Sequence, residues 1–228
     1  MNTPLMCSLQ LTQLSDHAVN ELAPSFKYLP HTSHADGEYR LRRYSIIRIH
    51  NGKIEPLPST DFIQSNDINH FQGNVVRHFE ALDDELIHCG GMLEMCKLFQ
   101  RANTLPDDQP IEIHQMRIAT LDSEVPASPE GIHQDGFEHI AVIGIDRHNI
   151  KGGEFLVYKD KTASPFLCTT LQHGEMAILA DDILWHNAHP IKAIKKHQQG
   201  YWDVFVLTTK RDPAWRLIPL LSGYYFQH

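Results

Sequence analysis

The chain has 228 residues, of which 42% are hydrophobic and 21% charged, and its formal net charge is −8. A chain of this length can fold as one domain with a sizeable core. The basic residues form no long block, so the electrostatic footprint of a nucleic-acid-binding protein is missing. No window approaches ~18 uninterrupted apolar residues, and the first residues do not have the pattern of a signal peptide. We therefore expect a cytoplasmic protein that binds neither nucleic acid nor a membrane.

The four cysteines lie at scattered positions, with no Cys-x-x-Cys pair. This spacing favours neither a disulfide framework nor a zinc–thiolate site. Reduced and mostly buried thiols are the expectation for a cytoplasmic protein.

The start of the chain predicts a short helix and then a β-hairpin. Ser15 precedes apolar residues at helical spacing, and Pro24 would end that helix. The run 39–50 is rich in β-branched and aromatic residues, as strands are. The Asn-Gly pair that follows is a turn signal, and it would lead into a returning strand at 54–58.

Residues 67–104 are predicted to be helical. Apolar residues between 75 and 82 recur at helical spacing, and Asp83 would start a second helix. Gly90-Gly91 is expected to break the second helix in two, because glycine costs roughly 1 kcal/mol against alanine inside a helix.

From residue 111 onward the pattern changes to short apolar runs separated by turn residues. The predicted strands are 111–121, 137–146, 153–158, 166–172, 175–179 and 201–209. Such a series favours an antiparallel sandwich or barrel, whose mouth the polar connections 123–129 and 192–200 could cover. We interpret the chain as one domain of 1–228, with mostly helical support in 1–110, a β core in 111–210 and a tail in 211–228.

A candidate metal site begins at His133-Gln134-Asp135. Side chains two residues apart in an extended segment point the same way, so His133 and Asp135 could reach one ion. Gly131 and Gly136 flank the pair and would permit tight turns beside that ion. Two histidines and one carboxylate form the ligand set of a non-haem Fe(II) oxygenase, although zinc accepts the same ligands.

Two histidines compete for the third ligand position, His186 and His189. Their odd spacing places them on opposite sides of an extended segment. Asp181-Asp182, just ahead of His186, could orient a ligand or cap a turn. Pro190 pushes His189 to an extended conformation but gives it no reason to bind metal. The pattern therefore favours His186 without excluding His189.

Four further segments are PEGIHQDG from Pro129, GGEFLVY from Gly152, ADDILWHNAHPI from Ala180 and GYWDVFVLT from Gly200. In this order they resemble a small bacterial family of Fe(II)/2-oxoglutarate dioxygenases that includes L-isoleucine 4-hydroxylase and a biofilm-stress protein. The run YRLRRYS from Tyr39 looks similar as well. The resemblance implies an α+β fold: a double-stranded β-helix (jelly-roll, cupin-like) barrel, with helices from the N-terminal half packed on it.

The resemblance also implies a chemistry. His133 and Asp135 match the His-x-Asp pair of the family, and His186 matches its distal histidine, which precedes a Pro-Ile pair. The implied activity is hydroxylation of an aliphatic carbon in a free L-amino acid or a similar small molecule. Fe(II) and 2-oxoglutarate would be the cofactors and dioxygen the oxidant. No catalytic residue is expected beyond the metal ligands.

One position departs from the family, because related sequences have an arginine where this chain has Trp202. A guanidinium there would pair with the distal carboxylate of 2-oxoglutarate, which tryptophan cannot do. Arg117 is the leading substitute and Lys192 the second. The departure keeps two alternatives open: a non-catalytic β-helix protein that binds a metal or ligand, and a metal enzyme of the same fold that does not use 2-oxoglutarate.

Phe137 and His139 would line the substrate pocket if they continue the face of the metal ligands. A free amino acid also needs a cation for its carboxylate and an acceptor for its ammonium group. The candidates for these two roles are Arg40, Arg42, Arg43 and Glu138.

Overall fold

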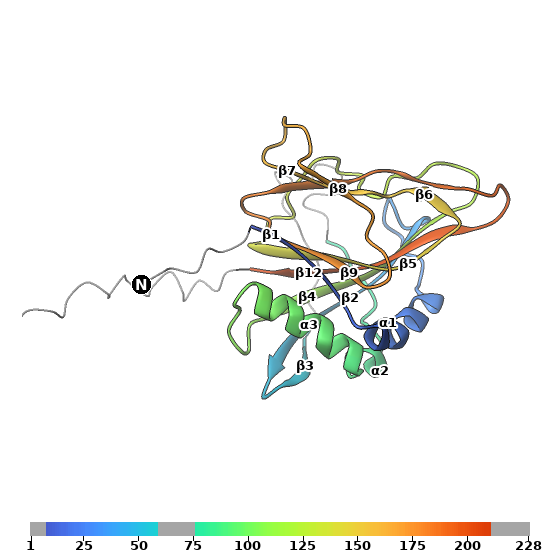
Figure 1. The fold of residues 1–228 in the computed structure, drawn as a ribbon. Coiled ribbons are helices and arrows are strands. Elements are labelled where there is room, and N and C mark those ends of the chain that lie inside the picture. Colours follow the sequence, from blue (N-terminus) through green and yellow to red (C-terminus); the bar gives the residue numbers. More distant parts are fainter. Residues whose placement is uncertain (1–7, 59–75, 211–228) are drawn as a thin grey trace, which may run out of the picture.

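A computed structural model of the chain describes residues 8–58 and 76–210. Within these residues, an antiparallel seven-stranded sheet forms the middle layer (Figure 1). In sheet order its strands are β1 (Leu9–Gln13), β9 (Glu175–Ala180), β5 (His139–His148), β12 (Gly200–Thr209), β4 (Ile111–Thr120), β2 (Arg40–His50) and β3 (Lys53–Leu57). Both halves of the chain therefore build one sheet.

The helices and the shorter strands lie on opposite sides of the large sheet (Figure 1). The helices are α1 (Asp16–Leu22), a 3-10 helix (Ala23–Tyr28), α2 (Asp84–Ile87) and α3 (Gly90–Ala102). The shorter strands are β10 (Trp185–Ala188), β7 (Phe155–Tyr158) and β8 (Leu167–Thr169), which form one sheet, and β11 (Ile191–Ala193), which pairs with β6 (Ile150–Gly152).

Alternating side chains of the large sheet divide the core in two. On β12, Phe205 and Leu207 belong to the cluster that includes residues of α1 and α3. Trp202 and Val204 belong to a second cluster, which includes Val157 of β7. The same strand therefore supports the helical layer with one face and turns the other face toward the shorter strands.

Several predicted elements are confirmed. Helix α1 ends at Leu22, and the Ser15 side chain caps it by accepting the N–H of Ala18 at 3.1 Å. Strands β2 and β3 form the predicted hairpin around an Asn-Gly turn whose two residues both have positive φ. The break at the Gly90-Gly91 pair is present too, since α2 ends at Ile87 and α3 begins at Gly90.

The predicted helix before Asp83 is wrong for the part that the structure describes, residues 76–83, and its start lies outside the described residues. This segment runs along the part of β2 that β3 does not cover. Tyr44 donates its N–H to the Glu80 carbonyl at 2.9 Å, and the N–H of Leu82 donates to Ser45 Oγ at 3.0 Å. The open edge of β2 supplies hydrogen bonds that outweigh the helical spacing of a few apolar residues.

The six strands predicted after residue 110 are all present with shifted ends, but the described residues contain four further strands that were missed: β1, β6, β10 and β11. All four are three to five residues long, too short for a periodic signal. The described residues contain no helix with both the length and the apolar character that crossing a bilayer demands.

Candidate metal centre and adjoining cavity

His133 and His186 are held side by side by their own backbones. The N–H of His133 donates to the His186 carbonyl at 3.0 Å, and the N–H of His186 donates to the His133 carbonyl at 2.9 Å. His186 lies on β10, opposite Val157 of β7, so this two-residue bridge ties the loop before β5 to the layer of shorter strands. Residues that are distant in sequence thus meet with a fixed spacing.

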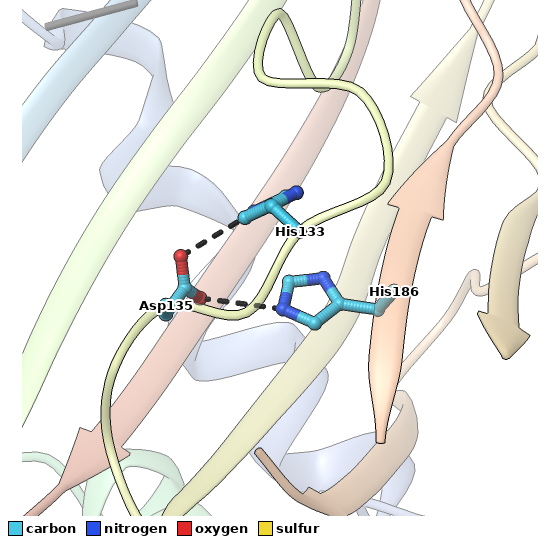
Figure 2. A group of neighbouring side chains, drawn as sticks. All are labelled: His133, Asp135 and His186. Atoms are coloured by element: carbon cyan, nitrogen blue, oxygen red, sulfur yellow. Dashed lines mark ion pairs between the residues drawn. The ribbon is translucent and has the colours of Figure 1, made fainter. Parts of the chain in front are cut away.

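The Asp135 carboxylate faces both imidazoles (Figure 2). Its Oδ1 is 3.4 Å from His133 Nε2, and its Oδ2 is 3.7 Å from His186 Nε2. The three side chains each offer one ligand atom, and these atoms lie within 4.8 Å of one another. Ligands about 2 Å from a common ion would be spaced in this way, so the group can hold a metal.

The contacts within this group favour the ionised form of the Asp135 carboxylate. Burial opposes charge on both residues, but the hydrogen bond and charge of Asp135 raise the pKa of His133 to about 9. In the same way the contact with His133 overcomes burial and holds the pKa of Asp135 well below its usual range. Asp135 is therefore ionised at neutral pH, and a metal ion would take the place of the proton that it shares with His133.

The two imidazoles are oriented for metal binding. His133 Nδ1 lies 2.8 Å from the Gly131 carbonyl, so a proton there is donated to the backbone and Nε2 is left toward Asp135. His186 is 5% exposed, and its Nε2 makes no hydrogen bond among the described residues, although the carboxylates of Asp135 and Asp181 lie 3.7 and 3.3 Å from it. Two carboxylates beside a buried imidazole nitrogen favour a cation at this point, such as a metal ion.

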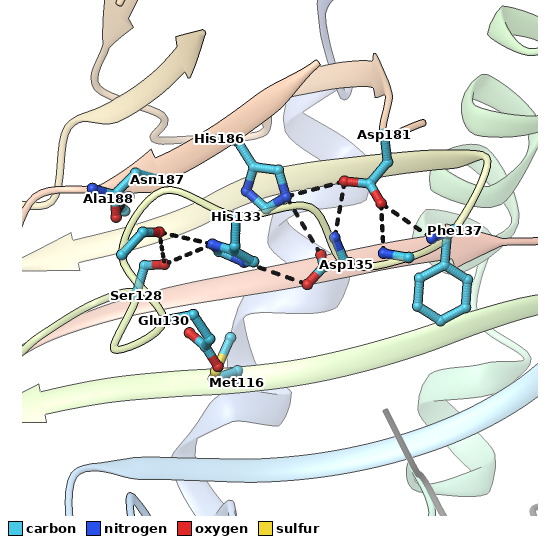
Figure 3. Close-up of polar contacts among 12 residues, drawn as sticks. Met116, Ser128, Glu130, His133, Asp135, Phe137, Asp181, His186, Asn187 and Ala188 are labelled. Atoms are coloured by element: carbon cyan, nitrogen blue, oxygen red, sulfur yellow. Dashed lines mark hydrogen bonds and ion pairs between the residues drawn. The ribbon is translucent and has the colours of Figure 1, made fainter. Parts of the chain in front are cut away.

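Asp181 fastens the loop that carries the aspartate. Its carboxylate is fully buried and accepts the N–H groups of Asp135, Gly136 and Phe137 at 3.0, 2.9 and 3.1 Å (Figure 3). Its Oδ1 also lies 3.3 Å from His186 Nε2. Asp181 is therefore placed to orient both candidate ligands, as the sequence suggested for an acidic residue ahead of His186.

The turn glycines behave as predicted, with φ of +73° at Gly131 and +83° at Gly136. The competing histidine is placed elsewhere. His189 is exposed, and its Nδ1 lies 3.0 Å from Glu154 Oε2, outside the metal-ligand group. Of the two histidines, only His186 lies with His133 and Asp135.

A cavity adjoins the three candidate ligands and has walls of contrasting chemistry. Its apolar lining includes Phe137, Val142, Phe155, Trp202, Val204 and Val206. Its charged lining includes Arg40, Arg42, Arg77 and Glu130. Such a cavity can accept a small ligand that carries both an aliphatic part and an anionic group.

Of the predicted cofactor- and substrate-binding residues, some line this cavity and others do not. Phe137 lines it, whereas His139 does not and instead lies 3.6 Å from Glu138. Arg117 is on the opposite face of β4, where Nε and Nη2 donate to the two Asp203 oxygens at 2.6 and 2.7 Å. Lys192 is exposed on β11 and is not part of the lining.

Of the candidates for recognising an amino acid, Arg40 and Arg42 line the cavity. Arg43 instead pairs with Glu80 and Asp83, and Glu138 is not part of the lining. Lining residues that sequence reasoning missed are Arg77, His114, Met116 and Glu130. The alternation of His114, Met116 and Ile118 on β4 was a usable signal once that strand was predicted. Nothing in the sequence marks Arg77.

The chain matches the 2OG-Fe dioxygenase family over residues 23–208. A solved structure of a bsmA homolog from Methylobium petroleophilum PM1 is 25% identical, with a TM-score of 0.72 over 85% of this chain and 81% of that one. IDO from Bacillus thuringiensis is 16% identical, with a TM-score of 0.68 over 89% of this chain and 94% of that one. The Fe(II)/(alpha)ketoglutarate-dependent dioxygenase TqaL is 12% identical, with a TM-score of 0.64 over 90% and 82%. A comparison with curated protein sequences gave no significant match.

The chain therefore belongs to the 2OG-Fe dioxygenase family. It is an oxidoreductase whose cofactors are Fe(II) and 2-oxoglutarate, and dioxygen and a small molecule are its substrates. Its mostly-sheet architecture with few helices is consistent with a jelly-roll, cupin-like fold. The donor set at the candidate centre fits the metal, because two imidazoles and a carboxylate are the ligands that non-haem Fe(II) takes.

Proposed function

We propose that the chain hydroxylates an aliphatic carbon of a free L-amino acid or a similar small molecule. The observation that carries the proposal is the convergence of His133, Asp135 and His186 beside a cavity with one apolar and one cationic wall. Fe(II) and 2-oxoglutarate, when bound, supply the oxidation of an unactivated carbon by dioxygen.

In this proposal His133 Nε2, His186 Nε2 and the Asp135 carboxylate hold Fe(II). Asp181 positions two of these ligands, because one of its oxygens lies near both the Asp135 backbone and the His186 ring. The Gly131 carbonyl fixes the third through His133 Nδ1. Groups that hold the ligands in this way raise metal affinity by reducing the reorganisation that binding requires.

The substrate class is supported by the lining of the cavity. Phe137, Val142 and Phe155 offer apolar surface to an aliphatic side chain. Arg42 can face a carboxylate, and Glu130 can accept an ammonium group. The resemblance of four sequence segments to the family that includes L-isoleucine 4-hydroxylase supports the same class of substrate.

The fold proposed with this function is a double-stranded β-helix within a single domain of 1–228. In this interpretation the large sheet and the shorter strands are its two walls, and the metal centre lies between them. Membership in the family favours this enzyme over the non-catalytic metal- or ligand-binding alternative.

The test is turnover with a panel of free L-amino acids, with isoleucine, leucine and methionine as the first members. Purified protein with Fe(II), 2-oxoglutarate and air is expected to couple succinate formation to a product that has gained one oxygen atom. Polar amino acids of similar size serve as controls for the apolar wall. If succinate forms at the same slow rate with every member and no amino acid is oxygenated, this substrate class is wrong.

A further inference from the structure

The cavity has a cationic wall that the candidate metal ligands do not use. It consists of Arg40 and Arg42 on β2 and Arg77 from the segment before α2. These three arginines are 8%, 7% and 3% exposed. A guanidinium buried to this extent needs negative charge close to it, because it has given up most of its contact with water.

Carboxylates of the protein compensate this charge unevenly. Asp36 Oδ2 lies 2.9 Å from Arg40 Nη1 but 4.0 Å from Arg42 Nη2. In the parts of the chain that the structure describes, no carboxylate oxygen comes closer to Arg42 than this. Arg42 Nη2 instead meets the Met116 sulfur at 3.3 Å, and a thioether is only a weak acceptor. Arg42 thus has more capacity left for an anion than Arg40.

The acid–base properties of Arg42 agree with this uneven compensation. Burial first, and then repulsion from Arg40, lower the pKa of Arg42 to about 9, and Asp36 opposes them only in part. A carboxylate brought by a ligand would reverse the shift by favouring the charged guanidinium.

The register of the large sheet relates this wall to Trp202. Across β12, β4 and β2, one row reads Trp202, Ile118 and Arg40, and the next row on the same face reads Val204, Met116 and Arg42. Both guanidinium groups contact the Met116 sulfur, at 3.1 Å from Arg40 Nε and 3.3 Å from Arg42 Nη2. The cation that tryptophan cannot supply on β12 is therefore present two strands away, on the same face of the sheet.

The wall is also close to the candidate metal ligands. Arg40, Arg42 and Arg77 line the same cavity as His133, Asp135 and His186. Glu130 Oε1 lies 4.0 Å from Arg40 Nη1, and Glu130 lines the cavity together with His133 and Asp135. A small ligand bound at the metal can therefore extend to the arginines.

We propose that Arg42, supported by Arg40 and Arg77, binds the carboxylate of a ligand that reaches the wall from the metal centre. The first source of that carboxylate is the distal end of 2-oxoglutarate, and the second is the amino-acid substrate. The inference rests on the proposed function, and it gives this chain a replacement for the arginine absent at Trp202. The guanidinium can meet both carboxylate oxygens at once, which an ammonium group cannot do.

The test uses two 2-oxo acids of equal chain length. 2-Oxopentanoate has a methyl group where 2-oxoglutarate has its distal carboxylate, so the ratio of their affinities measures recognition of that group alone. Calorimetry without oxygen gives both affinities for the Fe(II)-loaded wild type, Arg42→Gln, Arg42→Lys and Arg43→Gln. Arg43 is the matched control, because it lies on the same strand but pairs with Glu80 and Asp83 away from the cavity.

Arg42→Gln is expected to lower the affinity for 2-oxoglutarate by about tenfold or more. Its affinity for 2-oxopentanoate should stay within about twofold of the wild-type value. Arg42→Lys keeps the charge without the planar fork, so its loss should be smaller. If Arg42→Gln does not fold, Arg42→Lys is compared with the wild type in its place. Arg43→Gln should keep the wild-type ratio.

A second pair of ligands distinguishes the source of the carboxylate. L-Isoleucine and 2-methylbutylamine, which lacks the carboxylate, are titrated into protein loaded with Fe(II) and 2-oxoglutarate. One outcome is that Arg42→Gln loses the preference for L-isoleucine over 2-methylbutylamine while it keeps the wild-type preference for 2-oxoglutarate over 2-oxopentanoate. In that case Arg42 binds the carboxylate of the substrate, and the proposal still holds.

The proposal is overturned if Arg42→Gln keeps the wild-type ratio of affinities in both ligand pairs. It is also overturned if the variant loses affinity for 2-oxoglutarate and for 2-oxopentanoate by the same factor. Failure of the proposed function has a different result, since it appears in the turnover assay: no amino acid would be oxygenated, while the wild type would still prefer 2-oxoglutarate to 2-oxopentanoate and Arg42→Gln would still lose that preference.

Discussion

One oxygen of the buried Asp181 carboxylate connects two candidate metal ligands: Oδ1 accepts the Asp135 N–H at 3.0 Å and lies 3.3 Å from His186 Nε2. The other oxygen accepts the next two backbone N–H groups, those of Gly136 and Phe137. The position of the aspartate and the charge beside the histidine therefore depend on a side chain outside the proposed set of ligands.

Asp181→Asn is expected to lower Fe(II) affinity by about 10- to 100-fold, the usual effect of losing a group that orients ligands. The amide keeps one acceptor oxygen, so the variant should fold, whereas Asp181→Ala would leave three N–H groups without an acceptor. Asp182→Asn is the control, because that neighbour is exposed. Metal titration of the three proteins checks the prediction, and equal affinities would exclude a positioning role for Asp181.

The turn after Asp135 gives a second prediction. Gly136 has φ of +83° and Gly52, in the β2–β3 hairpin, has φ of +76°, so alanine is strained at either position. Both substitutions should cost about 1 kcal/mol of stability. Only Gly136→Ala should also weaken Fe(II) binding, since only that turn carries a candidate ligand. A similar loss of Fe(II) affinity in Gly52→Ala would mean that general destabilisation explains the effect.

Arg117 is expected to act in stability and not in 2-oxoglutarate binding. Its guanidinium is paired with Asp203, which is 1% exposed, and it lies 3.9 Å above the Tyr201 ring. Arg117→Gln should cost about 3 kcal/mol by leaving a buried carboxylate unpaired. The 2-oxoglutarate affinity of the folded variant should match that of Lys192→Gln and of the wild type, as measured by calorimetry.

The Arg117–Asp203 pair also predicts how the stability of the fold depends on pH. Burial raises the pKa of Asp203 to about 6 against the opposing effect of Arg117, whereas the unfolded chain should have a value of about 3.9. The folded state therefore binds the proton more tightly, and this residue adds stability as the pH falls from about 6 to about 4. Without Arg117 the preference for the neutral acid grows, so the stability gap between Arg117→Gln and wild type should narrow from pH ~8 to pH ~5. A gap that widens at low pH would contradict this account, and denaturant unfolding at both pH values decides between them.

The local part of the candidate site could be predicted from the sequence. His133 and Asp135 are two residues apart and bracketed by glycines, so their convergence needs little more than one short loop. The choice of His186 needed the partner strand, because pairing with β7 decides which of the two late histidines faces inward.

The cationic wall could not be predicted from the sequence, for a different reason. Arg40, Arg42 and Arg43 lie within four residues, and strand alternation puts Arg40 and Arg42 on one face of β2 and Arg43 on the other. Only the packing of the whole sheet decides which of these faces lines the cavity. Arg77 belongs to a segment whose apolar spacing predicted a helix, and tertiary hydrogen bonds to β2 overrode that preference. Long-range pairing thus placed the residues that composition and spacing could not.

The central claim is that His133, Asp135 and His186 hold Fe(II) together with 2-oxoglutarate. Its most direct test is an anaerobic titration of Fe(II) with and without 2-oxoglutarate, followed by the weak visible charge-transfer band of the chelate. We expect the band in the wild type and in His189→Ala, and its loss in His133→Ala and His186→Ala, all with the fold intact by circular dichroism. A band that survives in both ligand variants, or that never forms in the wild type, would contradict the claim.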